Sequence, residues 1–159
     1  MRAPSKRGSE YESANMTKAR SAARLAAVQA LYQHHMEAPP QARLLDEFHQ
    51  HRLGVEIEDM QFAAAETAFF DDVVIGAIAR IDEIDGLISS KLADGWSIER
   101  LDKTMLQILR AGTYELLARA DVPTGSAISE YVDVAHAFFD SRDAKFVNGV
   151  LDAIAKSVR

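Results

Sequence analysis

Arg142, Lys145 and Phe146 stand close together in the chain, and residues of these types could bind a single strand of nucleic acid. With about 100° between successive helical residues, Phe146 falls at the edge of an apolar stripe over 147–158, on the same ridge as Gly149. An aromatic ring with cations and small residues beside it can stack an unpaired base while the cations hold phosphates. Taken alone, the residues favour a plainer alternative, in which Phe146 only closes the core from the side.

The pair Asn148-Gly149 falls in the middle of the same helical repeat. Both residues have low helix propensity, and glycine inside a helix costs about 1 kcal/mol relative to alanine. A helix keeps such a pair where backbones must pack closely or where a surface must stay open. Segment 145–152 therefore points to a binding protein rather than to a catalyst.

Lys18, Arg20 and Arg24 open the first strongly helical segment. Arg20 and Arg24 are four residues apart, so both project from one face of the helix. Positive charge in a first turn opposes the helix macrodipole, and a nucleic-acid phosphate would reverse the sign of that cost. The open alternative is a solubilising face without a ligand.

The charge of the chain is uneven. The net charge is −6, from 18 basic and 24 acidic residues. Residues 1–24 hold six basic and two acidic residues, a net of +4, which leaves 12 basic and 22 acidic residues, a net of −10, in the rest. A basic end on an acidic body suggests two partners, an anionic polymer and a basic protein. A solvated tail on an acidic domain would give the same charges.

Catalytic and metal chemistry find little support in the sequence. The candidate metal clusters are His34-His35-x-Glu37 and His49-x-His51. Helical residues at such spacings point to different sides, so one helix cannot offer both histidines to one ion. The chain has no cysteine, and its eight glycines form no phosphate loop or Gly-x-Ser-x-Gly turn. We expect no metal, no cofactor and no enzymatic activity.

The sequence also gives expectations about location. No apolar run approaches the ~18 residues that a membrane-spanning helix needs. The basic N-terminus is not followed by the apolar core of a secretory signal. The absence of cysteine fits a reducing compartment. We expect a cytoplasmic protein that does not bind membranes.

The elements that must position these residues are helical throughout. Residues 1–16 are polar and without periodicity, so they are expected to form a disordered arm. Apolar residues then recur every three to four positions, and no useful segment alternates with period two. The prediction is an all-α protein of six or seven helices with short connections. The expected helices run from Thr17 to Pro39-Pro40, over 44–53, over 70–88, from Ser97 or Asp102 to Asp121-Val122-Pro123, over 126–139, and from Asp140-Ser141 onwards.

Five strings of the chain occur together, in the same order and spacing, in one known family: Arg20…Arg24-x-x-x-Val28-Gln29-Ala30-Leu31-Tyr32, Ile108-Leu109-Arg110…Tyr114-Glu115-Leu116, Asp121-Val122-Pro123, Ile128-Ser129-Glu130 and Lys145-Phe146-Val147-Asn148-Gly149-Val150-Leu151-Asp152. On these strings, residues 17–156 resemble the NusB family of bacterial transcription antitermination factors. The last string is the most specific.

The resemblance implies a fold and a function. The fold would be two packed three-helix bundles, here approximately 17–95 and 96–159 within one domain, without enzymatic activity. Such proteins bind the boxA element of ribosomal RNA leader transcripts as single-stranded RNA. They act as heterodimers with the ribosomal protein NusE, join other factors on RNA polymerase and suppress termination.

The resemblance also suggests the residues of the site. By position, it implies an RNA-binding set of Lys18, Arg20, Arg24, Arg142, Asp143, Lys145 and Phe146. Our weaker candidates for the protein-partner surface are Tyr32, Arg110 and Glu115. The cations would hold phosphates, and Phe146 with the Asp143 region would read exposed bases.

Departures from the family pattern keep other functions open. Many members have adjacent arginines where this chain has Arg20-Ser21-Ala22-Ala23-Arg24, and an acid-base pair where it has Met105-Leu106. A helical protein-interaction module that has lost RNA binding is one alternative. The N-terminal domain of a ribosomal RNA cytosine methyltransferase is another, although the chain has no strand pattern for the catalytic part. A homodimer could hide the basic face.

Overall fold

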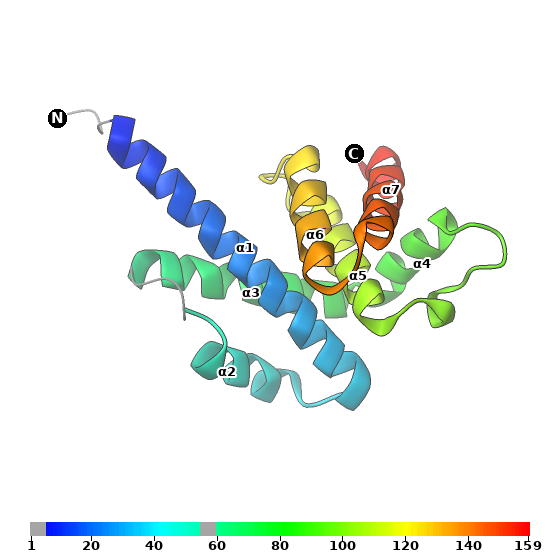
Figure 1. Ribbon diagram of the computed structural model, residues 1–159. Coiled ribbons are helices and arrows are strands. Elements are labelled where there is room, and N and C mark those ends of the chain that lie inside the picture. Colours follow the sequence, from blue (N-terminus) through cyan, green and yellow to red (C-terminus); the bar gives the residue numbers. More distant parts are fainter. Residues whose placement is uncertain (1–5, 55–59) are drawn as a thin grey trace.

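The computed structural model describes residues 6–54 and 60–159, and in these ranges the chain folds into seven α-helices and one short 3₁₀ helix, without a strand (Figure 1). The expected all-α class is confirmed. In chain order the elements are α1 (Lys6–Glu37), α2 (Gln41–His51), α3 (Met60–Ala79), α4 (Ile81–Lys91), η1 (Ile98–Arg100), α5 (Lys103–Ala118), α6 (Thr124–Phe138) and α7 (Ser141–Val158).

The first helix is longer than the sequence suggested. It begins at Lys6 rather than at Thr17, so residues 6–16, expected in a disordered arm, continue α1, and residues 1–5 lie outside the described residues. No proline interrupts the chain between Lys6 and Glu37, and alanines favour the helix. Its N-terminal part projects beyond the other helices (Figure 1).

The long helix expected over 70–88 is divided in two. Arg80 leaves the helical conformation with φ −111° and ψ 23°, and α4 starts directly after it. The apolar periodicity is right on both sides, because Phe70, Val74 and Ile84 are buried. The division lets α4 pack on α5 and α7, which are distant in sequence, so tertiary packing decides the break.

Two groups of helices share one core. α1, α2 and α3 pack together, with Phe48 of α2 stacked on Phe70 of α3 at 5.3 Å between ring centroids. α5, α6 and α7 pack on one another in the second group, and α4 packs on α5 and α7. α1 and α3 meet α5 across the boundary between the groups.

α5 lies at the centre of the molecule. Every residue from Met105 to Leu116 is buried, although the sequence predicted a single apolar stripe. The helix contacts α1, α3, α4, α6 and α7, so it has almost no free face. Its polar residues Arg110 and Glu115 are therefore buried and need partners inside the protein.

Two aspartates fix the starts of the helices that carry the site. Asp102 accepts hydrogen bonds from the backbone N–H groups of Thr104 and Met105 at the start of α5. Asp140 accepts from the N–H of Asp143 at the start of α7. The sequence predicted that helices begin at these two aspartates, with Ser97 as the alternative start for the first, and a capping aspartate explains each start.

Within the described ranges, no helix combines the length and the apolar character needed to cross a membrane.

Candidate nucleic-acid interface

Arg24 is a structural residue. Only 3% of it is exposed, and its Nε and Nη2 donate to the two carboxylate oxygens of Glu115 at 2.8 and 2.9 Å. Glu115 is fully buried, so this is a bidentate ion pair inside the protein. Each side chain is committed to the other, so the predicted contacts of Arg24 with RNA and of Glu115 with a protein partner are not supported by the structure.

Tyr131 completes this buried group. Its hydroxyl donates to the same carboxylate of Glu115. Burial, reinforced by the charge of Glu115, raises the pKa of Tyr131 well above its ordinary value, so the hydroxyl keeps its proton. The three side chains come from α1, α5 and α6, and they tie the two helix groups together.

Arg110 is also withdrawn from the surface. Its Nε and Nη2 each donate to a carboxylate oxygen of Asp85 in α4, both at 2.8 Å. Its Nη1 lies 3.2 Å from Nδ1 of His35. Burial, together with the charge of Arg110, lowers the pKa of His35, which favours the neutral ring that can accept this hydrogen bond. Arg110 holds α4 and α1 on α5, so its predicted contact with a partner is not supported.

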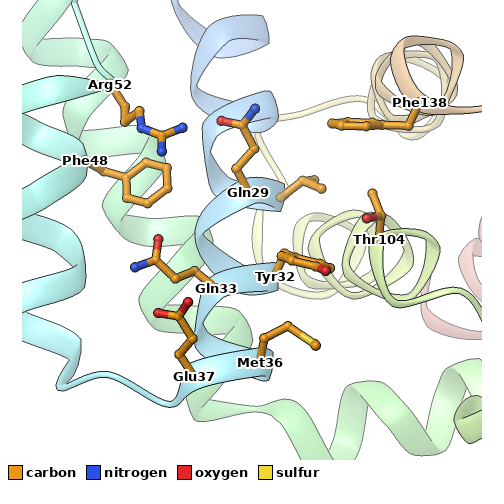
Figure 2. A pocket seen from close by; sticks show the side chains of 10 residues that line it. Gln29, Tyr32, Gln33, Met36, Glu37, Phe48, Arg52, Thr104 and Phe138 are labelled. Atoms are coloured by element: carbon orange, nitrogen blue, oxygen red, sulfur yellow. The ribbon is translucent and has the colours of Figure 1, made fainter.

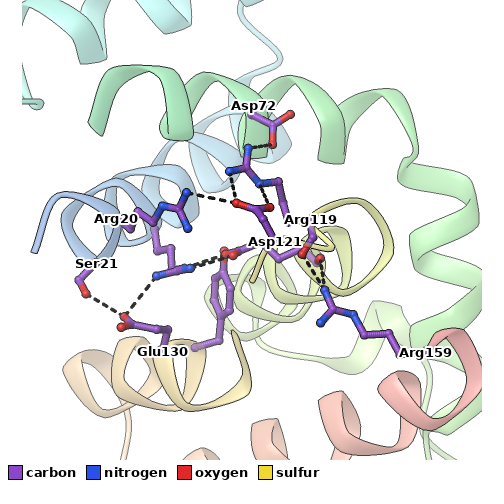
Figure 3. A network of polar contacts seen from close by, with 10 residues as sticks. Arg20, Ser21, Asp72, Arg119, Asp121, Glu130 and Arg159 are labelled. Carbon is purple, nitrogen blue, oxygen red and sulfur yellow. Dashed lines mark hydrogen bonds and ion pairs between the residues drawn. The ribbon is translucent and has the colours of Figure 1, made fainter. Parts of the chain in front are cut away.

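Arg20 is the partly exposed neighbour of Arg24 on α1. Its Nη2 donates to Asp121 at 3.2 Å (Figure 3). Its guanidinium lies over the ring of Phe69, 4.9 Å from the centroid. Asp121 also accepts two hydrogen bonds from Arg119, both at 3.0 Å. Because Arg119 already neutralises Asp121, Arg20 can turn to an outside phosphate without leaving an unpaired carboxylate.

A shallow pocket lies beside Arg20. Its volume is ≈ 330 Å³, and it opens between α1 and the start of α6, with Arg20, Ser126 and Glu130 among its lining residues. Glu130 is held by the hydroxyl of Ser21 at 2.8 Å (Figure 3). Lys18, two residues before Arg20, is exposed and makes no ion pair with the described part of the chain. Among the side chains that the structure describes, this end of the site offers cations but no exposed aromatic ring.

The start of α7 presents the aromatic part of the site. Phe146 is 37% exposed, with Arg142 and Lys145 exposed beside it, whereas Val147 is fully buried. Asp143 is half-buried, in the turn that Asp140 caps. Of the two interpretations of Phe146, an exposed ring on the rim of the core fits better than a ring that closes the core.

The two groups of predicted RNA-binding cations do not form one cluster. Arg20 is paired with Asp121, which shortly precedes α6, so it lies beside the start of that helix. Arg142 follows the end of α6 after a short turn (Figure 1). α6 has 15 residues and therefore rises about 22 Å. A strand that touched both groups would have to run along the length of α6.

A groove lies around Tyr32. We call it the Tyr32 groove; its volume is ≈ 400 Å³, and it is lined by Val28, Gln29, Tyr32, Gln33, Met36, Glu37, Phe48, Arg52, Thr104 and Phe138 (Figure 2). Tyr32 is 39% exposed, and Met36 and Phe138 are more exposed still. An exposed aromatic and apolar surface of this kind is typical of a protein-binding site.

The sequence model of the NusB family matches residues 21–156 of this chain. The chain belongs to the NusB family. It is 71% identical to the transcription antitermination protein NusB of Novosphingobium aromaticivorans over 142 residues, which are 89% of this chain and 96% of that protein. The protein of the same name from Sphingopyxis alaskensis is 67% identical over 140 residues, 88% of this chain and 94% of that protein. These relatives are antitermination factors, and the family is not one of enzymes.

Solved structures agree with this assignment. The structure of NusB from T. maritima has a TM-score of 0.70 and 33% identity, and it covers 86% of this chain and 90% of that one. A structure of the antitermination factors NusB and NusE in complex with double-stranded RNA has a TM-score of 0.74 and 28% identity, with 88% and 98% covered. Both support the NusB-like all-α fold.

Part of the surface of this NusB-family protein was not predicted from the sequence. Phe138, near the end of the helix expected over 126–139, is 44% exposed and forms one wall of the Tyr32 groove. Met36 was not considered, although it follows Tyr32 by one helical turn. Leu31 already fills the apolar position that faces the core. Tyr32 and Met36 are therefore an additional i, i+4 pair of large apolar residues, and this pair is the sequence signal that could have indicated the groove.

Proposed function

We propose that this protein binds the boxA element of ribosomal RNA leader transcripts as a heterodimer with NusE. It acts in the cytoplasm within RNA polymerase antitermination complexes and suppresses termination. Family membership supports an antitermination role, and the complex of a similar NusB with NusE and RNA supports both binding partners. The observation that carries the RNA proposal is the exposed ring of Phe146 beside Arg142 and Lys145 on a capped helix start.

This surface has the chemistry to read a single strand. A base–aromatic stacking contact contributes about 1–3 kcal/mol and tolerates any base, so Phe146 supplies affinity. Arg142 and Lys145 would neutralise the neighbouring phosphates and release counterions. The carboxylate of Asp143 can accept hydrogen bonds from exposed base amino groups, which gives some sequence choice. Lys18 and Arg20 would hold the strand at the other end of α6.

The Tyr32 groove is our candidate for the NusE contact. Aromatic residues and methionine are enriched at the centres of protein interfaces, and Tyr32, Met36 and Phe138 provide such a centre. Residues 25–159 carry a net charge of −10, which complements a basic ribosomal protein and would speed its encounter. Of the three sequence candidates for this contact, Tyr32 is the one that remains.

The test is a binding assay by fluorescence anisotropy. A labelled boxA-like single strand and a scrambled strand are titrated with the protein, with and without NusE, for wild type and Phe146→Ala. We expect a preference for boxA that increases with NusE and a loss of about tenfold or more in Phe146→Ala, the loss of one stacking contact. Trp96→Ala is the matched control, because Trp96 is an exposed aromatic residue in the connection after α4.

One observation favours a second function. Because Arg24 is buried, fewer cations are exposed to RNA than the sequence predicted. This fits a protein-interaction module that does not bind RNA. Binding of NusE without any RNA binding, alone or in the heterodimer, would establish this module instead. Equal, salt-sensitive binding to both strands in wild type and Phe146→Ala would reduce the surface to a non-specific contact with phosphates.

A further inference from the structure

Gly149 occupies the centre of the exposed face of α7, and nothing in the fold fills the space in front of it. A Cβ atom placed on Gly149 would meet no heavy atom within 4 Å. Gly112 in α5 is different, since its Cβ would lie 2.9 Å from Cδ1 of the buried Leu151. The fold therefore requires glycine at 112 for packing, and it has no such requirement at 149.

The position within the helix gives no other reason for glycine. α7 runs from Ser141 to Val158, so Gly149 is neither a cap nor part of a terminal turn. Its φ is not positive, because the described glycines with positive φ are Gly54 and Gly95. A glycine in such a place lowers stability relative to alanine. A ligand that approaches this face closely would give the glycine a benefit that offsets this cost, and the neighbouring residues decide whether such a ligand fits.

The neighbours of Gly149 identify what approaches. Residues three and four positions away on a helix surface are Lys145 and Phe146 on one side and Asp152 and Ala153 on the other. Asp152 is paired with Lys156 at 3.1 Å. The open surface thus lies between an exposed aromatic ring and an exposed cation that has no ion pair within the described part of the chain.

We propose that Gly149 is the point of closest approach for the backbone of the RNA, between a base stacked on Phe146 and a phosphate held by Lys145. This inference rests on the proposed RNA-binding function and adds a positioning residue to it. A methyl group at 149 would project from the helix surface into the space of the strand. It would hold the ribose and phosphate away from α7, so that stacking on Phe146 and contact with Lys145 could not both be made.

Gly86 provides a matched control. It lies in the middle of α4, is exposed, and its Cβ would likewise meet nothing within 4 Å. Its surface neighbours are acidic or small and polar, namely Asp82, Glu83, Ser89 and Ser90, so RNA has no reason to approach it. Alanine at either glycine should improve the helix equally, and only one of the two sites should affect RNA.

The experiment compares Gly149→Ala, Gly86→Ala and wild type in thermal unfolding and in boxA RNA binding, with NusE present in the binding assay. We expect both variants to raise Tm by about 2–4 °C, the gain of alanine over glycine in a helix of a protein of this size. Gly149→Ala should raise the Kd for RNA about fivefold or more, whereas Gly86→Ala should leave it unchanged. A variant that is more stable but binds more weakly cannot be explained by damage to the fold.

The alternatives are distinguishable. If Gly149→Ala binds RNA as wild type does while Phe146→Ala fails to bind, the role of Gly149 is refuted and the RNA-binding function stands. If Gly149→Ala lowers Tm, the fold needs the glycine and the inference is equally refuted. If wild type binds no RNA even with NusE, both the inference and the proposed function are overturned.

Discussion

At the scale of single residues, Arg20 and Arg24 show how one helix turn separates a binding residue from a structural one. Both are arginines on the same face of α1, and both lie over the ring of Phe69 at 4.9 Å. Glu115 meets Arg24 from a position 91 residues away, whereas Arg20 meets only the shared, exposed carboxylate of Asp121. Because the Arg24–Glu115 pair is buried, it determines the stability of the fold. Because the Arg20–Asp121 pair is exposed, Arg20 remains available to bind RNA.

Arg24→Ala is therefore expected to destabilise the protein strongly. It leaves the carboxylate of Glu115 buried with only Tyr131 as a partner, and breaking a buried ion pair in this way costs about 3–5 kcal/mol. Urea unfolding followed by circular dichroism measures the change. Arg20→Ala is the control and should cost less than about 1 kcal/mol, because its ion pair is exposed.

The same two variants separate stability from binding. At a temperature where both remain folded, Arg20→Ala should weaken RNA binding and Arg24→Ala should not. Weaker binding in a folded Arg24→Ala protein would show that the buried pair also shapes the RNA surface.

His35 gives the protein a pH-dependent contact. Burial, together with the charge of Arg110, lowers its pKa in the folded state below the 6.5 of an unperturbed histidine. Between these two values the unfolded chain binds more protons than the folded one, so stability falls as the pH drops from about 6.5. His35→Gln keeps an acceptor for Arg110 but cannot be protonated. Urea midpoints at pH 7.5 and 5.5 should differ less in this variant than in wild type, and equal differences would contradict the assignment.

At the scale of elements, the packing of α3 on α5 depends on a close contact. A Cβ on Gly76 would collide with the ring of Tyr114, whose hydroxyl donates to Asp72 at 2.7 Å. Gly76→Ala must therefore displace a nearly buried ring and disturb this hydrogen bond. We expect a loss of about 1–3 kcal/mol in the free energy of unfolding. Gly86→Ala should have the opposite sign, and a stabilising Gly76→Ala would mean that α3 and α5 can move apart freely.

Arg159, which follows α7, donates hydrogen bonds at the C-terminal end of α5. The guanidinium of Arg159, after α7, donates to the carbonyl oxygens of Leu116 at 2.9 Å, Arg119 at 2.8 Å and Val122 at 2.7 Å (Figure 3 labels Arg119 and Arg159). These carbonyls include groups that a helix end leaves without partners, and a cation there also suits the helix dipole.

Arg159→Ala should consequently lower the free energy of unfolding by about 1–2 kcal/mol, because several charge-assisted hydrogen bonds at a partly exposed site are lost. Thermal unfolding measures this change. Arg159→Lys keeps the charge but not the planar fork of donors, so its stability should fall between the two. A lysine variant as stable as wild type would show that the charge alone is sufficient.

The elements also show what the sequence could predict. Periodicity found the buried faces of α3 and α4, but it continues through Arg80 without a signal, because the same stripe serves both helices. The N-caps Asp102 and Asp140 were predictable, since capping depends on residues two or three positions away. The fates of Arg24, Arg110 and Glu115 were not, because each depends on a partner in another helix.

At the scale of the whole molecule, burial changes the charge that RNA can meet. The resemblance to the NusB family predicted the fold and the exposed Phe146, but it could not reveal that two of the arginines in its motifs are internal. Lys18, Arg142 and Lys145 are exposed without an ion pair in the described part of the chain, and Arg20 is partly available. Of the predicted RNA-binding residues, three or four cations thus remain available to RNA, at two ends of α6.

This small number sets the expected salt dependence of RNA binding. Each phosphate neutralised on a single strand contributes about −0.7 to the slope of log K against log salt concentration, so the protein alone should give a slope of about −2 to −3. Adding NusE, a basic ribosomal partner, should make the slope steeper as well as the binding tighter. Lys18→Gln should reduce the steepness by about 0.7, whereas Lys91→Gln, on α4 and away from this surface, should not change it. A slope much steeper than −3 for the protein alone would show that RNA contacts more cations than these four residues supply.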